Sequence, residues 1–131
     1  MPHLAGVVIG SQVELGALTL IQGGVISPTT IEDHAKLDNG VAIGHGVRVA
    51  RGASLAGGAC VAGSAVVGEE AWIGISSSIR DGRRIGARAL VGMDASMQHD
   101  LDEDAMARAS RPDVATRPAD DDPSKIGFAK R

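Results

Sequence analysis

The chain has 131 residues, a formal net charge of −3 and 18 glycines, whereas aromatic residues make up 2% of it and tyrosine is missing. The length fits a single domain, and the small negative charge gives no electrostatic basis for binding nucleic acid or an anionic membrane. Because large side chains are so few, we expect many small, regularly stacked contacts, as in a repeat architecture, instead of a conventional core.

No stretch of the sequence approaches the roughly 20 apolar residues that a membrane span needs. The opening residues, MPHLAGVVIG, also lack the charged segment and the longer apolar segment of a secretory signal peptide. We therefore expect no membrane span and a cytoplasmic location.

A six-residue apolar repeat begins near the N-terminus with Ile9, Leu15 and Ile21. A ten-residue step then leads from Ile21 to Ile31, and it contains Ser-Pro-Thr-Thr at 27–30. Solenoid repeats accommodate insertions at their corners. We therefore expect the residues around 27–30 to leave the stack as a small loop.

The repeat is strongest between residues 31 and 97. Every sixth residue there is aliphatic: Ile31, Leu37, Ile43, Val49, Leu55, Val61, Val67, Ile73, Ile79, Ile85, Val91 and Met97. Since such residues make up roughly a quarter of the chain, twelve successive matches by chance have a probability on the order of 10⁻⁷. The residue four places after each is small or β-branched except Arg83, where we expect an irregular corner that bulges outward.

A period of six differs from the 3.6-residue period of an amphipathic helix and indicates a short strand followed by a turn. Hexapeptide repeats are typical of parallel β-helices. Three units would make one triangular coil of about 18 residues, and coils would stack at the strand spacing of about 4.8 Å. The sequence therefore predicts an all-β fold, a parallel β-helix of five to six coils, in a domain that covers residues 1–97.

Residues 98–131 form a separate C-terminal segment in this prediction, because the aliphatic period ends at Met97. The run at 102–109 predicts one short helix. Residues from about 114 onward are rich in proline, aspartate and basic side chains. We expect them to be extended or disordered, since they carry too little apolar surface to offset their ordering entropy.

The segment KLDNGVAIGHGV, residues 36–47, carries three polar residues that the repeat does not explain: Asp38, Asn39 and His45. Histidine is the side chain whose unperturbed pKa lies near neutrality, which suits it to act as a general base. Gly63 stands three hexapeptides after His45, so it should lie beside it in the next coil. A slot without a side chain there would let the carbonyl group of a substrate approach a backbone N–H. We also expect Asp38 to lie beside His45.

The aliphatic repeat resembles that of the left-handed β-helix acyltransferases. More narrowly, the segment 36–47, the ten-residue step before it and LAGGACVAGSAVVGEEAWIG at 55–74 are similar to the β-helix domain of UDP-3-O-acylglucosamine N-acyltransferase, an enzyme of lipid A biosynthesis. The resemblance covers residues 7–97. It implies left-handed coils and a homotrimer with active sites between subunits. It also implies an acyl-CoA or acyl carrier protein donor, that is, a coenzyme A or phosphopantetheine thioester, and no permanently bound cofactor.

The same resemblance assigns roles to individual residues. It makes His45 the general base and Asp38 the residue that orients it, while the N–H of Gly63 stabilises the oxyanion. It places Asn39 in the acceptor or thioester pocket, although Asn39 could equally hydrogen-bond along the stack of turns. His34 is a further candidate for the substrate groove. The implied acceptor is the amine of an amino sugar or of a similar small molecule.

The sequence departs from that enzyme in two places. The family carries a second histidine 37 residues after the first, and this position is Gly82 here. The corner around it is basic, with Arg80, Arg83 and Arg84, and could hold a phosphate of the donor or form a solvated edge that blocks strand pairing. The sequence also starts almost at the first coil, so we expect no nucleotide-binding domain before it and a smaller acceptor.

A metal site and a silent scaffold are the alternatives to this interpretation. A zinc site of the carbonic anhydrase type needs three histidines, and only His34 and His45 fall within the regular repeat. The sequence therefore predicts no metal site. A catalytically silent trimer that serves as a structural or binding module would not need the Asp-Asn-His set, so the sequence favours the enzyme.

Overall fold

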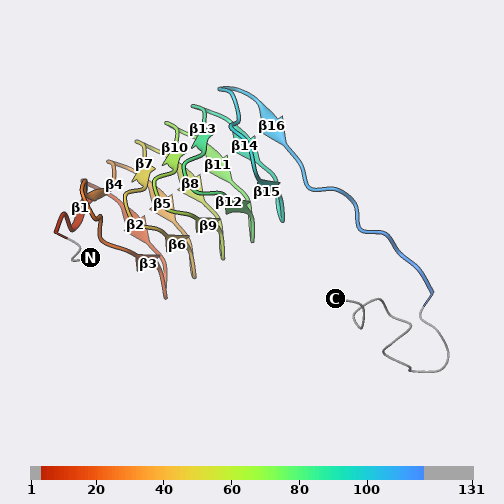
Figure 1. Ribbon diagram of the computed structural model, residues 1–131, viewed down its shortest axis with the longest axis horizontal. Coiled ribbons are helices and arrows are strands. Elements are labelled where there is room, and N and C mark those ends of the chain that lie inside the picture. Colours follow the sequence, from red (N-terminus) through yellow and green to blue (C-terminus); the bar gives the residue numbers. More distant parts are fainter. Residues whose placement is uncertain (1–3, 117–131) are drawn as a thin grey trace.

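The computed structural model describes residues 4–116, which form short strands and no helix (Figure 1). The strands are β1 (Val7–Ile9), β2 (Glu14–Leu15), β3 (Leu20–Ile21), β4 (Thr29–Ile31), β5 (Lys36–Leu37), β6 (Ala42–Ile43), β7 (Arg48–Val49), β8 (Ser54–Leu55), β9 (Cys60–Val61), β10 (Val66–Val67), β11 (Trp72–Ile73), β12 (Ser78–Ile79), β13 (Arg84–Ile85), β14 (Leu90–Val91), β15 (Ser96–Met97) and β16 (Met106–Ala107). None of the described residues lies in a helix long and apolar enough to cross a membrane.

The strands form three parallel sheets, which are the faces of a triangular prism (Figure 1). Face 1 contains β1, β4, β7, β10 and β13; face 2 contains β2, β5, β8, β11, β14 and β16; face 3 contains β3, β6, β9, β12 and β15. Consecutive strands lie on consecutive faces, and Val49 pairs with Val67, three repeats later. The described chain thus makes five complete coils and part of a sixth, which confirms the predicted β-helix.

The repeating aliphatic residues point into the prism and form its core. From Ile31 to Val91 each of them is 2% exposed or less. The small residues four places later are also buried, and at that position the Ser77 hydroxyl donates a hydrogen bond to the Gly74 carbonyl at 2.7 Å. Burying one such aliphatic side chain stabilises the fold by about 1.5–3 kcal/mol, and each does so by contacting its counterparts in the neighbouring coils.

The turns stack into three edges, which we name after the candidate residues they carry. The His34 edge joins face 1 to face 2 and contains the turns 10–13, 32–35, 50–53, 68–71, 86–89 and 102–105. The Asp38 edge joins face 2 to face 3 and contains the turns 16–19, 38–41, 56–59, 74–77 and 92–95. The His45 edge joins face 3 to face 1 and contains the segments 22–28, 44–47, 62–65, 80–83 and 98–100.

The ten-residue step is an insertion on the His45 edge, as predicted, but its position differs slightly. Thr29 and Thr30 belong to strand β4, so the residues that leave the stack lie before them. Thr29 is fully buried; its hydroxyl donates to the Gln22 carbonyl at 2.6 Å and accepts from the Gly46 N–H at 2.9 Å. This hydroxyl ties the inserted loop to the turn that carries His45.

The predicted helix at 102–109 is wrong. Leu101 forms a parallel bridge with Ile85, and β16 pairs in parallel with β14. The aliphatic period resumes after a four-residue step from Met97 to Leu101, and Ala107 follows six residues later. The open edge of β14 offers backbone hydrogen bonds, which outweigh helix propensity in so short a run. The β-helix therefore extends to Ala107, and the prediction for residues 117–131 lies outside the described residues.

The corner at Arg83 does not bulge, contrary to expectation. The Arg83 N–H donates to the Arg80 carbonyl at 3.2 Å, as in the other turns, and Val66 pairs with Arg84 in register. The next segment of this edge, 98–100, is shorter than a regular turn. The Arg83 side chain remains 40% exposed, although its Nε atom is buried.

Candidate functional site

His45 lies at the second position of the turn 44–47, between β6 and β7, and its side chain is exposed. The imidazole lies over Gly63 of the next coil, because a Cβ atom added to Gly63 would come within 2.6 Å of Nε2 and 2.7 Å of Cε1. The predicted neighbourhood of these two residues is therefore confirmed. Any side chain at position 63 would displace the imidazole.

Two backbone N–H groups are open beside this imidazole. On the Asp38 edge, the N–H at the corresponding position, that of Ala17, is capped by the Asn39 side chain at 2.8 Å. Gly63 has no side chain to cap the N–H of His45 in this way. The N–H of Gly63 likewise donates no hydrogen bond within residues 4–116. A free N–H next to a base is suited to an oxyanion that forms during acyl transfer.

The inserted loop forms a wall beside His45. A pocket of about 370 Å³ is lined by residues of the loop and of the two turns next to it: Val25, Ile26, Ser27, His45, Gly46 and Ser64. The loop reaches this place because it leaves the stack one coil before His45, on the same edge. The sequence reasoning treated the loop as an insertion and missed its contribution to the pocket.

Asp38 lies on a different edge from His45, so the expectation that it lies beside the base is not met within one chain. Face 3, through β6, separates the two residues, and no hydrogen bond or ion pair joins them in the described part of the chain. The Oδ1 atom of Asp38 instead accepts the N–H of Asn39 at 2.7 Å. The step from Asp38 to His45 is one hexapeptide plus one residue and therefore leads to the next edge.

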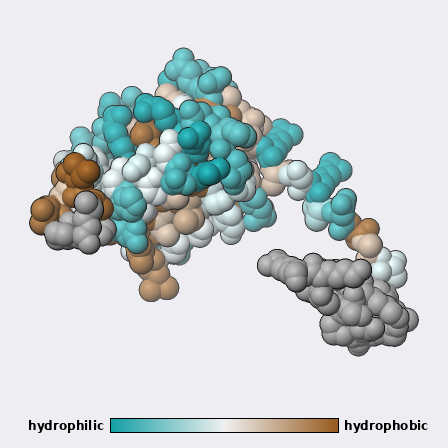
Figure 2. All heavy atoms as spheres, in the orientation of Figure 1, coloured by the Kyte–Doolittle hydropathy of each residue, from teal (hydrophilic) through white to brown (hydrophobic). Residues whose placement is uncertain are grey.

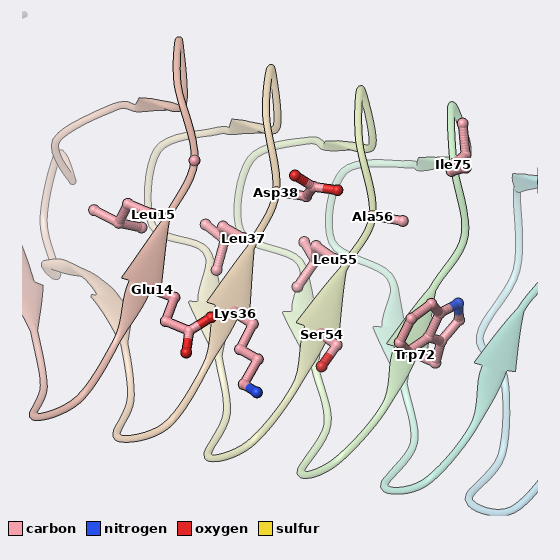
Figure 3. A pocket seen from close by; sticks show the side chains of 11 residues that line it. Glu14, Leu15, Lys36, Leu37, Asp38, Ser54, Leu55, Ala56, Trp72 and Ile75 are labelled. Carbon is pink, nitrogen blue, oxygen red and sulfur yellow. The ribbon is translucent and has the colours of Figure 1, made fainter.

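A second pocket, of about 520 Å³, adjoins Asp38 on face 2 (Figure 3). Glu14, Lys36, Ser54 and Trp72 form a row along the face, because their strands pair at these residues. Trp72 is 51% exposed, which makes it a large apolar contact surface. The sequence reasoning missed Trp72, although it is the one tryptophan of the chain and precedes an inward residue of the repeat.

The structure favours the structural role of Asn39. Its Oδ1 atom accepts the N–H of Ala17 in the preceding coil. Asp33 makes the same bond to the N–H of Ser11 on the His34 edge, at 2.7 Å. Since an unrelated position of the stack uses an identical bond, the bond at Asn39 is explained by turn stacking alone.

His34 is not brought to His45. It occupies the left-handed position of its turn, with φ of 63°, and its side chain is exposed on the His34 edge. Its backbone N–H donates to the Ser11 carbonyl at 3.0 Å. Residues 4–116 contain no group of three His, Cys, Asp or Glu side chains placed to hold a metal ion.

Two of the predicted donor-binding arginines share the edge of His45. Arg80 and Arg83 lie in the turn two coils beyond it, while Arg84 begins β13 on face 1. Arg80 lies 3.6 Å from Asp81, and Arg83 lies 3.9 Å from Asp100. The second distance exceeds hydrogen-bond length, and the Nε of Arg83 is buried without a hydrogen-bond partner in the described part of the chain. The side chains of Arg80 and Arg83 are 60% and 40% exposed, which leaves them accessible to a phosphate, although neighbouring carboxylates reduce the positive potential.

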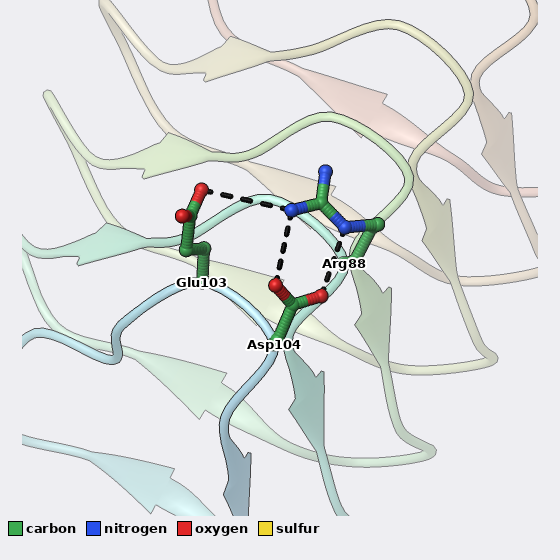
Figure 4. Close-up of polar contacts among 3 residues, drawn as sticks. All are labelled: Arg88, Glu103 and Asp104. Atoms are coloured by element: carbon green, nitrogen blue, oxygen red, sulfur yellow. Dashed lines mark hydrogen bonds and ion pairs between the residues drawn. The ribbon is translucent and has the colours of Figure 1, made fainter.

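A well-aligned ion pair lies away from these residues, on the His34 edge (Figure 4). The guanidinium of Arg88 donates to both carboxylate oxygens of Asp104, at 2.8 and 3.0 Å, and lies 3.7 Å from Glu103. The hydrogen bonds from Arg88 hold the pKa of Asp104 below its usual value. The pair ties the last turn of the described chain to the preceding coil.

Relatives of known function match part of the chain. No family model matches it. It is 52% identical over 44 residues to UDP-3-O-acylglucosamine N-acyltransferase 2 of Legionella pneumophila strain Paris. The aligned residues make up 34% of this chain and 13% of that protein. It is 48% identical over 44 residues to the UDP-3-O-acylglucosamine N-acyltransferase of Burkholderia multivorans, with 34% and 12% covered. The match thus spans a small part of these curated relatives.

Solved structures match over most of the chain. The crystal structure of PerB from Caulobacter crescentus, in complex with CoA and GDP-perosamine, has a TM-score of 0.67 at 25% identity and covers 82% of this chain and 55% of that one. The acetyltransferase domain of PglB from Neisseria gonorrhoeae, in complex with acetyl coenzyme A, has a TM-score of 0.67 at 18% identity, with 78% and 51% covered. The chain has the hexapeptide-repeat left-handed β-helix fold of these structures. The predicted resemblance and fold class are confirmed for this β-helix.

Proposed function

We propose that this β-helix is the catalytic part of an N-acyltransferase. It would move an acyl group from a coenzyme A or acyl carrier protein thioester to the amine of an amino sugar or of a similar small acceptor. The observation that carries the proposal is the exposed His45 imidazole over Gly63, beside a free backbone N–H. The similarity to N-acyltransferases that are crystallised with CoA and an amino-sugar nucleotide supports it.

The proposed reaction uses the imidazole of His45 and the backbone N–H of Gly63. The neutral imidazole of His45 accepts a proton from the acceptor amine as the nitrogen attacks the thioester carbonyl carbon. The carbonyl oxygen becomes an oxyanion and accepts a hydrogen bond from the N–H of Gly63. The intermediate then collapses, the carbon–sulfur bond breaks, and the leaving thiolate takes the proton from the imidazolium. The products are an amide and a free thiol.

Asp38 would reach His45 only from another copy of the chain. A neighbour that sets its Asp38 edge against the His45 edge would place the carboxylate and the Trp72 pocket opposite the base. In a homotrimer three such contacts, each between two different edges, close into a ring. Asp38 would then orient the imidazole and stabilise its protonated form. The arginines of the His45 edge would bind a phosphate of the donor, and the cytoplasmic location stays a prediction.

Release of free thiol from acetyl-CoA in the presence of a panel of amino sugars tests the proposed function. We expect turnover with the native protein and a loss of turnover with His45→Ala, while circular dichroism shows both proteins folded. Turnover that survives the substitution would remove His45 from its proposed role. No turnover with any acceptor or with acyl carrier protein donors, from a folded trimer, would favour the silent structural module.

A further inference from the structure

The N-terminal end of the prism is apolar, and no residue in the described range 4–116 covers it. Ile9 and Leu15 point inward in the first coil, yet they are 46% and 45% exposed, whereas their counterparts Ile31 and Leu37 are 0% and 2% exposed. The reason is that β1, β2 and β3 are the terminal strands of all three sheets at the same end. Figure 2 shows hydrophobic side chains gathered at the end where the chain starts.

The opposite end of the prism has a different character. The partial sixth coil covers part of it, through the Leu101 bridge and β16. Exposed carboxylates surround this coil at Asp100, Asp102 and 103–104. An apolar end would strip water from these charges without pairing them, so stacking of an N-terminal end on a C-terminal end is unfavourable.

We propose that two copies of this chain stack on each other through their N-terminal ends. The first coil, residues 4–27, carries one charged side chain, Glu14, which lies on face 2 next to Lys36 of the second coil, so repulsion between two identical ends is weak. A two-fold axis perpendicular to the prism reverses the strand direction. The edge strands of the two copies then lie antiparallel, and their unpaired backbone groups hydrogen-bond.

A second copy fits this end better than an unrelated surface does. It offers a triangular rim of unpaired strands of the same size, with an apolar centre formed by its own Ile9 and Leu15. Burial of these side chains against each other would give the first coil the cover that the inner coils already have. The contact is isologous, so it closes after two units and produces pairs instead of fibres. It does not depend on the proposed enzyme activity.

Sedimentation equilibrium tests the proposal. We expect the native protein to have twice the mass of each of two single variants, Ile9→Lys and Leu15→Glu, because each substitution places a charge in the contact. The halving is expected whether the unit that stacks is a single chain or a trimer. Ala87→Lys is the matched control for Ile9→Lys, because it adds the same positive charge on the His34 edge of the fifth coil, and it should keep the native mass.

A native protein with the mass of Ile9→Lys would overturn the proposal, and so would open-ended growth of the mass with concentration, which indicates head-to-tail stacking. The variants could also lose mass because their first coil unfolds, so hydrogen exchange of the native protein provides a test that needs no variant. The amides of residues 7–21 should become more protected as the protein concentration rises through the range in which the mass doubles. Protection that is independent of concentration contradicts the contact without recourse to any variant.

Discussion

Replacement of Gly63 by alanine should displace the base, His45, and leave the stability of the fold nearly unchanged. Gly63 is not among the residues with positive φ, so alanine can adopt its backbone conformation. The three atoms nearest to the added Cβ would all belong to the imidazole of His45, at 2.6, 2.7 and 3.1 Å. The clash is therefore relieved by movement of an exposed side chain and not of the backbone.

The size of the effect follows from these distances. Ordinary contact begins at 3.4 Å, so the imidazole has to retreat by about 0.8 Å from its position 2.6 Å away. Rotation of an exposed side chain is cheap, and the free energy of unfolding should change by less than about 1 kcal/mol. A reacting group displaced by about 1 Å can lose on the order of 10²-fold in rate. We expect kcat/KM to fall by this factor while the melting temperature stays nearly unchanged.

Thiol-release kinetics and thermal unfolding of the same samples measure both quantities. Gly57→Ala is the matched control for stability, because a Cβ atom there would meet its nearest neighbours at 3.6 and 3.9 Å, and this variant should retain the native melting temperature. If Gly63→Ala stays within about twofold of the native rate while His45→Ala is inactive, the glycine slot does not position the base. A large loss of stability in Gly63→Ala would contradict the assumption that the imidazole moves freely.

Three further substitutions probe the surroundings of the site and the last coil. Thr29→Val removes the hydroxyl that satisfies one backbone group of the inserted loop and one of the turn that carries His45, so we expect a loss of about 1–3 kcal/mol in chemical denaturation, and a neutral result would contradict the anchoring role. Asn39→Ala should cost about 1 kcal/mol with unchanged kcat/KM, whereas a selective loss of activity would support a pocket role instead. The Arg88 hydrogen bonds lower the pKa of Asp104 in the folded state, so the stability advantage of the native protein over Asp104→Asn is fully present above about pH 4. It should disappear as the pH falls through the lowered folded-state pKa, and melting curves that keep the advantage at the acid end of the series would refute this.

The coil could be predicted from the sequence because each face of the coil takes one hexapeptide, and each hexapeptide points one aliphatic residue inward. Ile31 pairs with Val49 because three hexapeptides make one turn of the prism. The strand at the C-terminus could not be predicted in the same way. Its apolar positions, Leu101 and Ala107, are out of phase with Met97 and too few to define a period, so the local helix propensity dominated the prediction.

The candidate site was only partly predictable. A separation of one full coil places Gly63 next to His45, whereas the shorter step from Asp38 to His45 leads to the adjacent edge. In the proposed trimer, the residues that meet His45 from the neighbouring subunit depend on outward side chains such as Trp72. The repeat constrains the inward residues alone, so the sequence does not show which outward surfaces meet.

Mixing two inactive variants tests the central claim most directly. In the proposed trimer each site takes His45 from one copy and Asp38 from its neighbour. We expect Asp38→Ala and His45→Ala each to be strongly impaired, and an equimolar mixture that is unfolded and reassembled to regain about a quarter of native turnover, since random assembly unites one intact copy of each group in about one site in four. Mixing without reassembly is the control. A reassembled mixture no more active than its two components would contradict a site shared between subunits.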